Sequence, residues 1–295
     1  MLLTAGDLVL DVLVRSDTGP HPGSEGDGQI VLAPGGSAAN VARWAAHLGF
    51  PARFVGSVGD DFAGRWLTEA MRSSGVDVRV DAVAGEPTGV VAVWVDPSGE
   101  RTMVTDRTAN RYLPPRLLDE DTWSDVTHFH FTGYSLLASQ TRERILAAKA
   151  IAVRRGCTLS FDPGPHRRLV QHVGAAAILA ACDGVDVLLP NEAEAVALAA
   201  AKSVEEAIDR LSARSSIVCI KRGSAGCLLA RGAQRLSIVP PGHTAVDTTG
   251  AGDAFAAGFL AVWKRGASVP EAAAAGVRAA ARAVSHVGAG PQGWA

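Results

Sequence analysis

The sequence predicts an α/β fold in which a mostly parallel β-sheet is covered by helices on both faces. Short apolar runs of β-type composition alternate with Ala-rich runs of helical spacing along most of the 295 residues. The strand-like runs are almost continuously apolar, which is typical of strands buried on both faces. Hydrophobic residues make up 47% of the chain and charged residues 20%, so the material for a large core is present.

The elements alternate in order along the chain. The helix predicted at 37–48 has Val41, Trp44, Ala45 and Leu48 at helical spacing, and the helix at 61–75 ends at a glycine. The strand-like runs are 2–14, 52–59, 76–83, 127–133, 157–164, 186–191 and 216–223. Further helical stretches are 141–156 and 191–201.

Two segments interrupt this alternation, because neither has a helix attached. Residues 12–33 are rich in Gly, Pro and Asp, and residues 88–105 consist of two β-rich runs around the turn sequence DPSG. We expect the two segments to form a small β-sheet that acts as a lid over the main domain. The alternative is two separate surface excursions.

Bulk composition excludes several classes of protein. The formal net charge of −2 provides no basic field for nucleic acid or acidic lipid, and the apolar runs are too short to span a bilayer. The N-terminus lacks a basic leader, so we expect a strand there and not a signal peptide. The four cysteines form no CxxC pair and the eight histidines have no zinc spacing. We therefore expect a cytoplasmic protein.

The segment DTTGAGDAFAAGFL, residues 247–260, carries the strongest chemical signal. Gly250, Ala251 and Gly252 leave backbone amides open to a ligand at the start of a helix, which favours a phosphoryl group. Asp253 follows directly, where it could accept a proton from an attacking hydroxyl. The alternative is that Asp253 only complements the helix dipole.

Two further junctions between a strand and a helix carry polar side chains. Gly35 and Gly36 form a turn before a helix with Asn40 in its first turn, which suits sugar hydroxyls or is an ordinary turn. Asn191 and Glu194 fit a helix cap with its capping-box glutamate. Glu194 equally fits a position beside Mg²⁺ and its waters, and the spacing does not separate the two.

A fourth junction, KRGSAG at residues 221–226, predicts a tight turn at the end of a strand. Gly223 and Gly226 form the turn, and Lys221 faces either nucleotide phosphates or solvent. The sequence contains no Walker A motif and no protein-kinase HRD or DFG motif.

Taken in order, these four junctions resemble the ribokinase-like (PfkB) carbohydrate kinases over almost the whole chain. GGSAANVARWAAHLG resembles the N-terminal signature of that family and DTTGAGDAFAAGFL its C-terminal signature. The resemblance implies one domain over 1–295, with three α/β/α layers and lid segments at about 12–33 and 88–105. It also implies transfer of the γ-phosphoryl of ATP, with Mg²⁺, to a hydroxyl of a sugar or sugar acid.

The resemblance assigns roles residue by residue. Asp253 matches the catalytic base, and Gly250, Ala251 and Gly252 match the anion hole. Substrate positions fall on Asp11, Gly35, Gly36 and Asn40, while nucleotide and metal positions fall on Asn191, Glu194, Lys221, Gly223 and Gly226. Asp247 and Thr249 fall where some family members bind a monovalent cation such as K⁺, as does the segment around Ser285.

The identity of the sugar is less defined. SFDPGPHRRL resembles a DPN-x-R segment of 2-keto-3-deoxygluconate kinases and fructokinases, with Gly164 in place of the usual Asn. Arg107 could meet the carboxylate of an acidic sugar, or it is a surface arginine. A nucleoside kinase of the same family and a non-catalytic sugar or nucleotide sensor are the alternatives. We further expect either a homodimer formed through the lids or a monomer whose lid folds onto its own domain.

Overall fold

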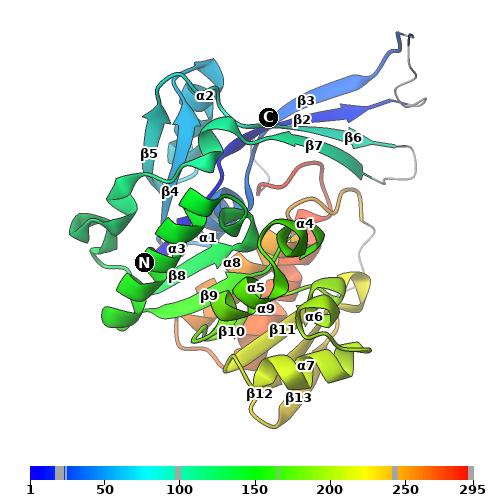
Figure 1. Cartoon of the computed structure of the whole chain (residues 1–295). Coiled ribbons are helices and arrows are strands. Elements are labelled where there is room, and N and C mark those ends of the chain that lie inside the picture. Colours follow the sequence, from blue (N-terminus) through cyan, green and yellow to red (C-terminus); the bar gives the residue numbers. More distant parts are fainter. Residues whose placement is uncertain (17–22, 24, 97–100, 165, 241–244, 292–295) are drawn as a thin grey trace.

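A large, mostly parallel sheet and a small sheet that projects from one end of it make up the fold (Figure 1). The computed structural model describes residues 1–16, 23, 25–96, 101–164, 166–240 and 245–291. Within them the large sheet has the strand order β13-β12-β11-β10-β9-β8-β1-β4-β5, and β12 runs antiparallel to both of its neighbours, β11 and β13. Its strands are β1 (Leu2–Ala5), β4 (Ala52–Gly59), β5 (Asp77–Val83), β8 (His128–Thr132), β9 (Thr158–Asp162), β10 (Val187–Leu188), β11 (Ile217–Lys221), β12 (Cys227–Arg231) and β13 (Gln234–Ile238).

Helices cover both faces of the large sheet, as the alternation predicts. One face packs on α1 (Ser37–His47), α2 (Phe62–Ser73), α8 (Ala251–Trp263) and α9 (Val269–Ala283). The other packs on α3 (Ser139–Arg154), α4 (His166–His172), α5 (Ala175–Cys182), α6 (Glu192–Leu198) and α7 (Val204–Ser212). Short 3₁₀ turns lie at Thr108–Arg111, Pro115–Leu118, Glu120–Trp123, Gly133–Leu136 and Gly223–Ala225. None of the helices in these described ranges is long and apolar enough to cross a membrane.

The first strand-like run differs from its prediction, because it forms two strands in two different sheets. β1 ends at Ala5 in the large sheet, and β2 (Val9–Arg15) begins after Gly6, Asp7 and Leu8 in the small one. Both segments are apolar, so the pattern of residue types contains no sign of the change of partner strand. This break places Asp7 at the carboxyl end of β1, next to the site described below.

The small sheet consists of β3 (Gln29–Gly35), β2, β6 (Val90–Val95) and β7 (Arg101–Asp106), in that spatial order. β2 pairs antiparallel with β3 and parallel with β6, and β6 pairs antiparallel with β7. The chain between β6 and β7 was predicted as the turn DPSG, and residues 97–99 of it lie outside the described residues. Strand register places Asp11 on one face of this sheet, which we call the inner face.

The opposite, outer face of the small sheet is apolar. Register aligns Leu32, Val12, Ala92 and Val104 in one row, and Ile30, Val14, Trp94 and Thr102 in the next. Ile30 is 64% exposed, Leu32 56% and Val104 70%.

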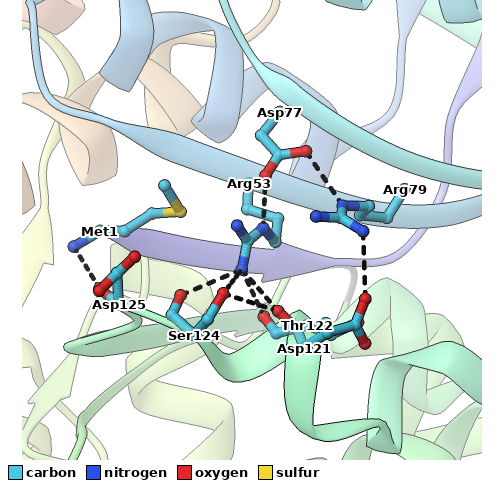
Figure 2. Close-up of polar contacts among 8 residues, drawn as sticks. All are labelled: Met1, Arg53, Asp77, Arg79, Asp121, Thr122, Ser124 and Asp125. Atoms are coloured by element: carbon cyan, nitrogen blue, oxygen red, sulfur yellow. Dashed lines mark hydrogen bonds and ion pairs between the residues drawn. The ribbon is translucent and has the colours of Figure 1, made fainter.

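A cluster of charged residues lies at the other edge of the large sheet, where the parallel strands begin (Figure 2). The buried Arg53 pairs with Asp77 at 2.7 Å and donates to the backbone carbonyls of Thr122 and Ser124 at 2.8 and 3.1 Å. Arg79 joins Asp77 to Asp121, and these contacts tie the 3₁₀ turns before β8 to β4 and β5. These contacts fix the structure at this edge, and the polar residues described below lie at the opposite edge.

Candidate active site

Polar side chains gather at the carboxyl edge of the large sheet, among them Asn191 and Lys221, which the sequence predicts. Asp7, Asp162, Asn191 and Lys221 lie at or just beyond the ends of β1, β9, β10 and β11. Ligands of open parallel sheets bind at this edge, because strands end there and helices begin. The N-termini of α1 and α8 reach the same place, because Ser37 of α1 and Asp253 of α8 are hydrogen-bonded.

The N-terminus of α8 is shaped by the small residues before Asp253. Gly250 is the N-cap and has a left-handed backbone with φ of 71°. A Cβ atom there would lie 2.6 Å from the carbonyl oxygen of Ala289, so glycine alone fits without a shift of that loop. The first-turn amides of α8 then face an open space beside Gly252, and helix N-termini of this kind favour anions.

Asp253 is partly buried in the first turn of α8 and is held by two side chains of α1. Ser37 Oγ donates to one carboxylate oxygen at 2.6 Å, and Asn40 Nδ2 donates to the other at 3.0 Å. Burial raises the pKa of Asp253 to about 7, although the bonds from Ser37 and Asn40 favour its ionised form. A carboxylate with a pKa near neutrality is well matched to accept a proton at physiological pH.

Asp11, on the inner face of the small sheet, lies within electrostatic reach of Asp253. A Cβ atom on Gly35 would lie 2.3 Å from the Asp11 carboxyl group, so the two residues are in close contact. Burial, and next the charge of Asp253, raises the pKa of Asp11 to about 7. Gly36 is the N-cap of α1 with φ of 104°. The structure thus brings Asp11, Gly35, Gly36 and Asn40 together at Asp253.

Arg107 follows β7 and is buried, not a surface arginine. Its Nη2 pairs with Asp7 at 2.7 Å and donates to the carbonyl oxygen of Tyr134 at 3.0 Å. Both charged side chains are about nine-tenths buried. Arg107 Nε has no hydrogen-bond partner among the described residues, which leaves a buried donor on this side of the site.

The opposite side of Asp253 carries an ion pair between Lys221 and Asp162. Lys221 Nζ lies 3.1 Å from the position that a Cβ atom on Gly252 would take, so its ammonium stands beside the α8 amides. Burial opposes its charge, but Asp162 and Glu194 outweigh burial and raise the pKa of Lys221. A permanent cation at this place adds to the attraction of the helix terminus for a phosphoryl group.

Asn191 and Glu194 form the capping box that the sequence predicts for α6. Asn191 Oδ1 accepts from the Glu194 amide and Glu194 Oε2 accepts from the Asn191 amide, both at 2.8 Å. Glu194 is also 6% exposed and close to Asp162, so burial and then that charge raise its pKa to about 7. Two neighbouring carboxylates that share a single lysine are a donor set that fits Mg²⁺ held partly through water.

A cavity of about 500 Å³ opens directly beside the α8 amides. It is lined by Lys221, Gly223, Gly226 and Gly252 and by the apolar side chains of Phe255, Val277, Ala280 and Val284. A cavity that combines a cation and helix-terminal amides with apolar walls has the character of a nucleotide site. Asn191 does not line it.

Asp247 and Thr249 lie on the loop before α8. Asp247 Oδ1 accepts from the Thr249 amide at 2.9 Å and its hydroxyl at 2.6 Å, while Oδ2 accepts from the Gly288 amide at 2.9 Å. The buried Asp247 carboxylate therefore joins this loop to the segment after Ser285.

Four residues of the site were not identified from the sequence, namely Asp7, Ser37, Tyr134 and Asp162. Ser37 stands inside the GGSAAN motif, and Asp162 lies near the end of the strand-like run 157–164, so position at a strand end was an available signal for Asp162. Asp7 lies in the middle of the run 2–14, which the sequence pattern does not divide. Tyr134 had none, and the charge of Asp253 acts on its phenol in this structure.

Comparison with known proteins shows the family of this chain. The family model described as pfkB family carbohydrate kinase matches residues 3–294. The chain belongs to the PfkB family. It is an ATP-dependent sugar kinase, a phosphotransferase of that family.

Among PfkB relatives, an ATP-dependent ribose-1-phosphate kinase of Halopiger xanaduensis is 36% identical over 272 residues, 89% of this chain and 84% of the relative. A fructokinase of Klebsiella pneumoniae is 33% identical over 270 residues, 87% of this chain and 82% of the relative. The solved structure of an adenosine kinase from Sinorhizobium meliloti is 28% identical, with a TM-score of 0.90 and coverage of 99% and 95%. That of a fructokinase from Vibrio cholerae O395, with fructose, ADP and a calcium ion bound, is 25% identical, with a TM-score of 0.81 and coverage of 99% and 96%.

Proposed function

We propose that this kinase transfers the γ-phosphoryl of ATP to a primary hydroxyl of a neutral sugar. Asp253 accepts the proton of that hydroxyl, and the amides of Gly250, Ala251 and Gly252 bind the charge that grows on the transferred group. The observation that carries the proposal is the position of Asp253. It lies between the cluster of Asp11 and Asn40 on one side and the 500 Å³ cavity on the other.

The phosphate side of the proposal uses Lys221 and Glu194. Lys221 stands 3.1 Å from the Gly252 Cβ position, where it neutralises charge on the phosphoryl group in transit. Glu194, with Asp162 beside it, would hold Mg²⁺ through water. Bound Mg²⁺ supplies charge neutralisation to the phosphates of ATP. Gly223 and Gly226 line the cavity for the nucleotide, and Asn191 fixes Glu194 through the capping box.

The sugar side of the proposal uses Asp11, Asn40 and Arg107, with Gly35 and Gly36 allowing close approach. The charge of Arg107 is offset by Asp7, so its buried Nε–H acts as a donor to a sugar oxygen and not as an isolated cation for a carboxylate. Asp11 adds a further acid to this side. That balance of charges supports a neutral sugar over a sugar acid.

A nucleoside is the second candidate acceptor. The adenosine kinase structure matches with a TM-score of 0.90 and supports it, because the likeness extends over 99% of this chain.

A substrate panel with ATP and Mg²⁺, followed by ADP release, tests the proposal. It contains fructose, ribose, adenosine, ribose 1-phosphate and 2-keto-3-deoxygluconate. We expect a neutral sugar to have the highest kcat/KM. A higher kcat/KM for 2-keto-3-deoxygluconate or for ribose 1-phosphate would refute the role given to Arg107. A higher kcat/KM for adenosine would favour the nucleoside as acceptor.

We further propose that two copies of the chain pair through the outer faces of their small sheets. Two rows of mostly apolar side chains, with exposed Ile30, Leu32 and Val104, support a second copy, because an exposed apolar face marks an interaction surface.

Activation by K⁺ at Asp247 and Thr249 stays a prediction, and omitting K⁺ from the assay tests it.

A further inference from the structure

A line of polar side chains runs through the apolar layer between the large sheet and α8. His128 and His130 alternate along β8, and Thr158, Ser160 and Asp162 alternate along β9, so all five point to one face. Register pairs His128 with Thr158 and His130 with Ser160. His128, His130 and Ser160 are fully buried, and His128 packs edge-on against Trp263 of α8 at 5.8 Å.

Short hydrogen bonds connect these side chains into one chain. Lys264 Nζ donates to Thr158 Oγ1 at 2.9 Å, and Thr158 Oγ1 lies 2.7 Å from His128 Nδ1. Ser160 Oγ lies 2.7 Å from both His128 Nε2 and His130 Nδ1. His130 Nε2 is buried and has no hydrogen-bond partner among the described residues. This chain of hydrogen bonds thus begins at the edge where the strands start and ends inside the site.

The far end of the chain meets the ion pair of Asp162 and Lys221. Asp162 is two residues beyond Ser160 on the same face, and its partner in the register is Thr132, two residues beyond His130. Diagonal neighbours of this kind are within reach of long and aromatic side chains. The charges of Asp162 and Lys221 are those that act on the His130 ring.

The known donors determine which atom donates the hydrogen in each bond of this chain of hydrogen bonds. The Lys264 ammonium has no acceptor, so Thr158 Oγ1 accepts from it. The hydroxyl hydrogen of Thr158 goes to His128 Nδ1 at 2.7 Å in preference to the Thr127 carbonyl at 3.3 Å. Burial lowers the pKa of both rings, that of His130 to about 4, so each ring is neutral and has one N–H.

The remaining hydrogens follow in turn. His128 has its hydrogen on Nε2 and donates to Ser160 Oγ, whose own hydrogen goes to His130 Nδ1. His130 is left with its hydrogen on Nε2. The order also suits the charges at the two ends, because the hydrogens point away from the Lys264 ammonium and toward the Asp162 carboxylate.

We propose that this chain of hydrogen bonds holds His130 in its Nε2–H form and that His130 is a positioning residue for the Asp162–Lys221 pair. The Nε2–H has no hydrogen-bond partner among the described residues, so it acts on the Asp162 carboxylate as an oriented dipole and not through a hydrogen bond. Asp162 in turn keeps the Lys221 ammonium beside the α8 amides. The consequence for Lys221 rests on the proposed function, whereas the position of the hydrogen on His130 does not.

Nitrogen NMR of ¹⁵N-histidine-labelled protein at neutral pH tests the hydrogen position directly. Long-range ¹H–¹⁵N correlations distinguish the Nε2–H and Nδ1–H forms, and the signals are assigned by their loss in His128→Gln and His130→Gln. We expect both rings as Nε2–H in the unmodified protein. We expect a mixture of the two forms at His130 in Ser160→Ala and in Lys264→Met. An Nδ1–H or doubly protonated His130 in the unmodified protein would overturn the proposal.

Kinetics test the consequence for catalysis. His130→Gln keeps an N–H near the Nε2 position and should retain kcat, whereas His130→Phe should lower kcat about tenfold with little change in the sugar KM. Cys219→Ala, which truncates a buried residue of β11 on the same face, is the matched control. A kcat for folded His130→Phe equal to that of Cys219→Ala would refute the positioning role. Should His130→Phe not fold, Ser160→Ala gives the same comparison.

Discussion

Ser37→Ala is the substitution that probes the environment of Asp253 most selectively. It removes a hydroxyl that donates to the Asp253 carboxylate at 2.6 Å and leaves the Asn40 bond of 3.0 Å in place. The bond from Ser37 favours the ionised carboxylate, so its loss must raise the pKa of Asp253 above the present value of about 7. A general base works only when ionised. Activity is therefore present above this pKa and lost as the pH falls through it.

The size of the change follows from the strength of the bond. A hydrogen bond to a charged group contributes about 1.5–3 kcal/mol, and 1.36 kcal/mol corresponds to one pKa unit, so the pKa rises by about 1–2 units. At pH 7 the ionised fraction then falls from about a half to between about a tenth and a hundredth. We expect kcat/KM at pH 7 to fall about 5- to 50-fold and to recover to within about twofold at pH 9.5.

The assay is kcat/KM for the sugar from pH 5.5 to 9.5 at saturating ATP and Mg²⁺. Ser212→Ala is the control, because its hydroxyl also makes a 2.6 Å bond, to the Ile208 carbonyl in the remote helix α7. An acid limb of Ser37→Ala that coincides with that of Ser212→Ala would refute the argument. So would a loss of activity that is equal at every pH, because it would point to misplacement of α1 and not to a shifted carboxylate.

Three further predictions concern the metal, the structural edge and the lid. Glu194→Ala should raise the Mg²⁺ concentration for half-maximal activity. The control Glu271→Ala removes the same capping interaction in α9 and should leave that concentration unchanged. The same Mg²⁺ dependence in both variants would leave Glu194 as a helix cap. Arg53→Met should lower the free energy of unfolding, measured in urea, by about 2–3 kcal/mol, because it leaves buried carbonyls unpaired. Arg79→Met should lower it by less than about 1 kcal/mol, because its ion pairs are more exposed. Equal losses of stability in the two variants would contradict this prediction. Trp94→Asp, in the middle of the outer face, should convert a dimer to monomers in light scattering and raise the sugar KM; a monomer in the unmodified protein would end the dimer proposal.

Local signals in the sequence predicted those parts of the fold and site that depend on neighbouring residues. The run at 52–59 is β4 over the same residues, and the Asn191–Glu194 cap forms as its spacing predicts. Gly250 adopts the left-handed backbone that a glycine before a helix favours. Each of these features is set within a few residues of the chain.

Contacts between distant segments could not be predicted in the same way. Arg107 and Asp7 are 100 positions apart, and Lys221 and Asp162 are 59 apart, so the sequence pattern of neither pair indicates the other. The hydrogen bond from Ser37 to Asp253 could not be predicted for the same reason, although the two residues lie in the N-terminal and C-terminal signature motifs. Whether a lysine or arginine forms an ion pair depends on which carboxylate the neighbouring strands place beside it. That placement is known only once the order and register of the strands are known.

The most direct test of the central claim is the kcat of Asp253→Asn. Asparagine keeps the size of the side chain and can still bond with Ser37 and Asn40, but it cannot accept the proton of the sugar hydroxyl. With the best sugar of the panel and saturating ATP and Mg²⁺, we expect kcat to fall at least about 100-fold while calorimetry shows ATP still bound. A variant that keeps more than about a tenth of the original kcat, a cost below about 1.4 kcal/mol, would contradict the assignment of Asp253 as the base.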